Sequence, residues 1–120
     1  MSKFKLGEAL EPVLLGDTLD IELTLTKGDG TEYVVPTGAV VQIALVNLTT
    51  FAVVGAAAIA GESTPPNDWP NGVVAASVTL PSSYASVPVQ LTIEVQVTSG
   101  GLNRSWRTEA LYELQQDGIV

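Results

Sequence analysis

The chain has 120 residues, of which 46% are hydrophobic and only 15% are charged, and its net charge is −8. A chain of this length and composition forms one domain with its own hydrophobic core, which excludes intrinsic disorder. The basic residues number five, and none lies between Thr31 and Asn103. Because phosphate groups are bound by clustered cations, this composition argues against nucleic acid and against an anionic membrane surface as partners.

The chain contains neither cysteine nor histidine. Disulfides, thiolate nucleophiles, Cys-type zinc sites and the common catalytic triads are therefore excluded. Residues 1–12 carry two lysines without a following apolar stretch, which argues against a signal peptide. We interpret residues 1–11 as an extended N-terminal arm and residues 12–120 as a β-sandwich domain.

The first clear element is an alternating stretch at residues 18–26. Its apolar positions are Leu19, Ile21, Leu23 and Leu25, and polar side chains lie between them. A period of two residues predicts a strand with one buried face. The turn sequence "KGDG" at 27–30 predicts a hairpin, in which residues 31–35 return as a short strand that ends at Pro36.

Residues 40–61 form an uncharged stretch that is long enough to span a membrane. Gln42 and Asn47 interrupt it, and no basic residue flanks it, so two strands joined at "NLTT" are the better interpretation. In the first of these strands Val41, Ile43 and Leu45 share a face. Gly55 lies inside the second strand, which is typical of a β-bulge.

The second half of the chain continues the pattern. A proline-rich loop at residues 60–72 precedes an apolar strand that ends at Pro81, and residues 81–88 could hold one helical turn. Residues 89–98 alternate again and predict a long strand. Residues 104–114 fit either a strand or a helix, and the preceding Ser-Gly-Gly turn favours a strand that closes a hairpin.

Taken together, these strands and turns predict an all-β protein of seven or eight strands. The prolines agree with it, because each lies at a strand edge or in a loop and none lies inside a predicted strand. Short strands separated by turns at intervals of this kind are typical of an antiparallel sandwich or barrel.

Carboxylates are the only candidates for catalysis or metal binding. Asp20 and Glu22 lie on one strand face, which we interpret as a solvated outer face, and Asp29 has only Glu32 near it, which favours a hairpin turn over a calcium loop. We therefore predict no catalytic, cofactor or metal site, and a protein that is not an enzyme.

The tryptophans and arginines are candidates for partner contacts. Trp69 lies in the stiff proline-rich loop, where it is either a binding anchor or a lid over one end of the core. Trp106 is expected in the core or at a sheet edge. Arg104 and Arg107 flank it, and either pair with local carboxylates or form a salt bridge between subunits.

The run "VLLGDTLDIELTLTKGDGTEYVVPTGAVVQIALVN" at residues 13–47 resembles the opening of small structural modules in tailed-bacteriophage virions, found in decoration, tail and baseplate proteins. The matching positions are Gly16, Asp17, Thr18, Asp29, Gly30, Thr31, Thr37, Gly38, Ala39 and Val41. The run at residues 78–101 also looks like these modules, whereas residues 104–120 are longer and more polar than a plain closing strand.

This resemblance implies an antiparallel immunoglobulin-like β-sandwich. It also implies a non-enzymatic virion subunit, made in the host cytoplasm, that acts by contacts with capsid or tail proteins and with further copies of itself. The expected contact residues are Phe4, Leu6, Pro65, Pro66, Trp69, Arg104 and Arg107. The alternative is a carbohydrate-binding or adhesin-type module, with Trp69 and Tyr33 or Tyr84 as stacking platforms on one face.

Overall fold

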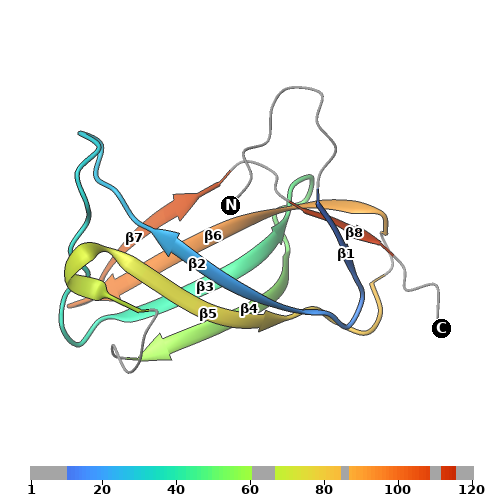
Figure 1. Ribbon diagram of the computed structural model, residues 1–120, viewed down its shortest axis with the longest axis horizontal. Helices are drawn as coiled ribbons and strands as arrows, with labels where there is room; N and C mark the ends of the chain where they lie inside the picture. The colour runs from blue at the N-terminus through green and yellow to red at the C-terminus, as the bar shows by residue number, and fades with distance from the viewer. Residues whose placement is uncertain (1–10, 61–66, 85–86, 109–111, 116–120) are drawn as a thin grey trace.

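The structure is a computed structural model that describes residues 11–60, 67–84, 87–108 and 112–115 (Figure 1). The described part contains eight strands and one short 3-10 helix, so the all-β prediction is confirmed. The elements are β1 (Glu11–Leu14), β2 (Thr18–Thr24), β3 (Val40–Asn47), β4 (Val53–Ala60), η1 (Trp69–Asn71), β5 (Val73–Thr79), β6 (Val89–Ser99), β7 (Leu102–Arg107) and β8 (Tyr112–Gln115).

The strands form a six-stranded sheet and a two-stranded sheet. The larger sheet has the order β1-β8-β6-β3-β4, with β7 also paired to β6, and the smaller sheet pairs β2 with β5. Figure 1 shows the larger sheet curling around the smaller one. β1 pairs with β8 in parallel, and the other pairs are antiparallel. The prediction of a wholly antiparallel architecture is therefore wrong for β1 and β8, which no hairpin connects.

The core lies between the two sheets and comes from the predicted alternating strands. In β2 Ile21 is buried, and its polar neighbours face solvent. The buried hydrophobic cluster is made of Val13, Ile21, Leu25, Val35, Ala39, Val41, Ile43, Leu45, Trp69, Val74, Val78, Leu80, Leu91, Ile93, Val95, Val97 and Leu114. Burial of this apolar area is the main favourable term in the folding free energy.

Residues 40–60 fold as the two strands predicted for them. The register of β3 with β4 shifts between Leu45 and Val46, which pair with Gly55 and Val53, so Val54 forms the expected bulge. Gly55 is required by a close approach, because a Cβ there would lie 3.0 Å from the carbonyl oxygen of Thr79 in β5. In the described part of the chain, no helix is long and apolar enough to cross a membrane.

Residues 31–35 do not form the predicted strand. Their backbone bonds go to two different segments, since Tyr33 N donates to Leu25 O (2.9 Å) and Val35 N donates to Trp69 O (3.0 Å). The hairpin ladder is reduced to the bridge between Thr26 and Glu32, which the Tyr33–Leu25 bond makes together with a bond from Lys27 N to Thr31 O (2.7 Å). The turn itself is present, with a bond from Gly30 N to Lys27 O (2.9 Å).

The C-terminal stretch is two strands, β7 and β8, instead of one. Both pair with β6, at residues 94–99 and 89–91 respectively. Between them Thr108 bonds Ile93 twice, through its backbone N–H (2.9 Å) and through its hydroxyl oxygen, which accepts from Ile93 N (3.0 Å). This side-chain bond takes the place of a ladder bond and marks the end of β7.

Two smaller predictions are also wrong. Pro12 lies inside β1, where it is tolerated because β1 is the outermost strand of its sheet. The helical turn falls at residues 69–71 and not within the described part of 81–88. It forms where Pro70 fixes φ in the first turn, and Gly72 ends it with a φ of 78°.

Candidate protein-contact surface

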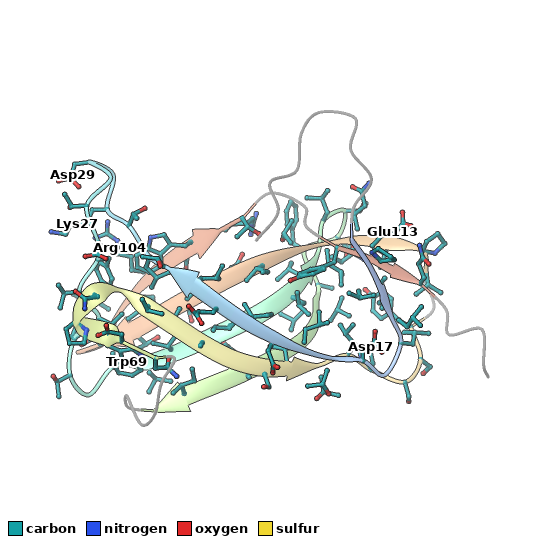
Figure 2. The ribbon with its side chains drawn as sticks, in the orientation of Figure 1. Asp17, Lys27, Asp29, Trp69, Arg104 and Glu113 are labelled. Carbon is teal, nitrogen blue, oxygen red and sulfur yellow. The ribbon has the colours of Figure 1, made fainter. Side chains whose placement is uncertain are left out.

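The predicted contact residues fall into two groups. Phe4, Leu6, Pro65 and Pro66 lie outside the described residues, so the structure says nothing of them. The other three are described, with Trp69 in η1 and Arg104 and Arg107 in β7. Figure 2 shows Trp69 and Arg104 at the same end of the molecule as Lys27 and Asp29.

Trp69 is 3% exposed and belongs to the hydrophobic core. This position corresponds to the second of its two interpretations, in which the side chain covers one end of the core. Trp69 and Pro70 also line a cavity of about 430 Å³ together with residues 34–38. The contact of Trp69 with a partner stays a prediction.

Arg104 and Trp106 hold the loop at residues 27–34 against β7. Trp106 Nε1 donates to Thr26 O (2.9 Å), and the Trp106 and Tyr33 ring centroids are 4.9 Å apart. The Arg104 guanidinium carbon lies 5.2 Å from the Tyr33 centroid and 5.6 Å from that of Trp106, so among the described residues this cation binds two aromatic rings and forms no ion pair.

Arg107 pairs with a local carboxylate, which was one of the two roles predicted for it. Its Nε donates to Glu94 Oε2 (3.0 Å), and its Nη2 forms an ion pair with the same oxygen. The Arg107 guanidinium carbon also lies 4.8 Å from the ring centroid of Phe51, in the β3–β4 turn. A salt bridge from Arg107 to another subunit stays a prediction.

On the outward side of β3 Val40 and Gln42 are exposed, whereas Ala44 and Val46 are buried. We call the exposed positions on the outward side of β3 and β4, with the turn between the strands, the β3–β4 face. Neither strand contains a charged residue. Phe51 is 57% exposed and Val53 is 61% exposed, and Val40 is also exposed. Arg107, whose guanidinium lies over the Phe51 ring, is paired with Glu94. Residue-by-residue reasoning missed Phe51 and Val53, although the lack of charge in residues 40–60 indicated such a surface.

The opposite side of the molecule is acidic. Asp20 and Glu22 are exposed on β2, and Asp20 accepts a hydrogen bond from Ser77 Oγ in β5. The β3–β4 face, without charged residues in either strand, and the outer side of β2, with its exposed carboxylates, therefore differ in character.

The carboxylates of Asp29 and Asp17 stabilise turns by accepting hydrogen bonds from nearby residues. Asp29 Oδ1 accepts from Thr31 Oγ1 (2.6 Å) and from Thr31 N (2.9 Å), and the Thr31 hydroxyl is the main reason that the pKa of Asp29 lies below its usual value. Asp17 Oδ2 accepts from Leu14 N (2.9 Å) in the β1–β2 turn. No group of three or more acidic residues gathers as a metal site within the described ranges.

The three aromatics named for the carbohydrate alternative, all within the described residues, do not form a flat platform of the kind that a sugar ring stacks on. Trp69 is in the core, and the Tyr33 ring is tilted by 58° against Trp106. Tyr84 is half-buried, and its hydroxyl accepts from Asn47 Nδ2 (3.1 Å). Comparison with protein-family models, with curated proteins and with solved structures gives no match to this chain. What the protein does therefore has to be inferred from its own surface chemistry.

Proposed function

We propose that the protein is a non-enzymatic structural subunit of a tailed-phage virion, an accessory capsid or decoration protein or a tail-associated subunit, which acts through protein contacts. The observation that carries this proposal is the uncharged β3–β4 face, with Phe51 and Val53 more than half exposed in a chain of net charge −8. The central part of a protein interface is depleted in charge, as β3, β4 and their turn are, and often contains an aromatic side chain such as Phe51.

We also propose that the fold is an immunoglobulin-like β-sandwich, and the strand pairing supports this. In the larger sheet β7 and β8 both pair with β6, and β3 and β4 follow on its other side. This order corresponds to strands G, F, C and C′ of immunoglobulin-like folds, with β7 and β8 together in the place of G. The separate pair of β2 and β5 corresponds to the B and E strands of the facing sheet. The stretch that resembles phage modules, residues 13–47, extends from within β1 through β3.

The β3–β4 face also has a suitable anchor. Phe51 has a φ of 61°, and the Asn47 side chain holds this turn by accepting from Thr49 N (2.8 Å) and Thr50 N (3.2 Å). A large aromatic side chain on a turn held in this way binds a partner with little loss of conformational entropy.

The test uses virions of a phage that encodes the chain. The chain is first removed from these virions, and the purified chain is then tested for co-sedimentation with them. Wild-type chain is expected to rebind, and Val53→Asp is expected to rebind at least tenfold more weakly, because a partner would bury an unpaired charge. Leu102→Asp is the matched control, since Leu102 is 77% exposed in β7 and lies outside the β3–β4 face.

Circular dichroism and a denaturation midpoint would establish that both variants keep the fold. Equal rebinding of all three proteins would remove the β3–β4 face as the contact surface. A wild-type chain that ignores virions and binds an immobilised glycan would instead favour the carbohydrate-binding alternative.

A further inference from the structure

One edge of β2 carries backbone groups without a strand partner in the described part of the chain. Leu25 N donates to Gly72 O (2.8 Å) and Leu80 N donates to Asp17 O (2.7 Å), at the two ends of the β2–β5 ladder. Since bonded positions alternate along an antiparallel pair, the odd-numbered residues of β2 bond to β5. The N–H and C=O groups that point away from β5 belong to Thr18, Asp20, Glu22 and Thr24.

The far edge of β5, in contrast, is closed. Asn67 Oδ1 accepts from Ala75 N (2.9 Å), and Asn67 Nδ2 donates to Ala75 O (3.2 Å), so one carboxamide replaces a strand partner. Asp68 and Val73 bond each other through both backbone pairs (3.0 and 2.9 Å). An edge that is neither covered nor bulged, such as that of β2, is a template for an added strand.

The surroundings of this edge specify what such a strand must look like. On the core side lies a cavity of about 180 Å³, lined by residues 23–26, by Ile93 and Val95, and by residues 106–108. On the solvent side lie the exposed carboxylates of Asp20 and Glu22. Because side chains alternate along a strand, the matching segment alternates apolar with basic residues.

The chain itself contains one such segment. Only two of its five basic residues lie two positions apart, Lys3 and Lys5, and they alternate with Phe4 and Leu6 in the sequence "KFKL". We propose that residues 3–6 of a second copy of this chain add to the free edge of β2, with the lysines beside Asp20 and Glu22 and with Phe4 and Leu6 on the core side.

The strand pairing argues for a second copy over the same copy. β1, which follows residues 3–6 in the chain, pairs with β8 in the larger sheet and not with β2. Pairing β2 with β2 of another copy would oppose like charges, which is destabilising. The inference deepens the proposed function, since it names a partner for the protein.

The test combines amide hydrogen exchange with sedimentation of the full-length chain. If the inference is right, the wild-type protein is a dimer or a closed ring, and the amides of Asp20 and Glu22 are protected. The double variant Lys3→Glu with Lys5→Glu is expected to be monomeric, with exchange at these amides more than tenfold faster. Asp20→Lys with Glu22→Lys is expected to sediment as a monomer too, and the four changes combined are expected to restore association.

Lys27→Glu is the matched control, because it reverses a lysine in the 27–30 turn and is expected to change neither readout. Rapid exchange at Asp20 and Glu22 in the wild-type protein would overturn the inference. Protection in a protein that sediments as a monomer would also overturn it, in favour of a segment of the same copy. So would a failure of the combined charge reversal to restore association. Virion rebinding measured with the Val53 variant is a separate result, so the two proposals can fail independently.

Discussion

At the scale of single residues, Gly72 shows how one backbone position holds three segments together. It ends η1 with a φ of 78°, and a Cβ at this position would lie 2.8 Å from Tyr33 O and 2.9 Å from Leu25 O. Both oxygens belong to the backbone, so neither can move aside alone. The loop at residues 27–34 therefore packs closely against the β2–β5 sheet only because residue 72 has no side chain.

We expect Gly72→Ala to lower the free energy of unfolding by about 2–4 kcal/mol, because it combines a left-handed backbone with a steric clash. Gly101→Ala is the control, since its φ of 80° is similar but nothing lies within 4 Å of the added Cβ. That variant is expected to lose about 1 kcal/mol. Urea denaturation measures both values, and equal losses would show that the close approach at Gly72 has no energetic effect.

At the scale of elements, the two strands of the smaller sheet differ in how their outer edges end. The edge of β5 is satisfied by the side chain of Asn67, whereas the edge of β2 has no partner strand among the described residues. Ala75, which Asn67 bonds, is buried. A buried backbone N–H and C=O must find partners within the protein, so Asn67 stabilises β5 at a point where the sheet ends.

We expect Asn67→Ala to lower the free energy of unfolding by about 1–3 kcal/mol, because it leaves two buried backbone groups unpaired. Hydrogen exchange at the Ala75 amide should rise in the same variant. Asn71→Ala is the control, since the Asn71 side chain bonds only the Asp68 carboxylate (2.8 Å) at the surface. If the two variants are equally stable, Asn67 does not close the edge in solution.

At the scale of the whole molecule, stability and surface function are assigned to different faces of the same strands. The core faces of β3 and β6 are packed against β2 and β5, while the outer side of β3 and β4 leaves Val40, Phe51 and Val53 in solvent. Apolar side chains in the core therefore stabilise the fold, whereas exposed side chains of the same residue types are available for contacts with a partner.

We expect Leu45→Ala to lower the free energy of unfolding by about 2–5 kcal/mol, because Leu45 is fully buried and its truncation leaves a cavity. Leu102→Ala, at an exposed position of β7, is expected to change it by less than about 0.5 kcal/mol. Denaturation with urea compares them. A large effect of Leu102 at concentrations where the chain associates, but not at lower ones, would place Leu102 in a contact between copies.

The sequence alone was sufficient for the local elements. Alternation identified β2 and β6 and the face of β3 that carries Val41, Ile43 and Leu45, and Gly55 marked the bulge in β4. The division of the uncharged stretch at residues 40–61 into two strands was predictable because Gln42 and Asn47 interrupt it and no basic residue flanks it. A side-chain period of two residues is a property of the strand itself and can be read without knowing its neighbours.

Only the tertiary structure decided which backbone groups meet. It paired β1 with β8 in parallel, divided the C-terminal stretch at Thr108, directed Tyr33 and Val35 to different partners, and left one edge of β2 open. It also buried Trp69 and joined Arg107 to Glu94. Hydrogen bonds and packing between distant segments depend on the whole arrangement of strands, because any strand edge offers the same N–H and C=O groups and local sequence does not encode which edge will receive them.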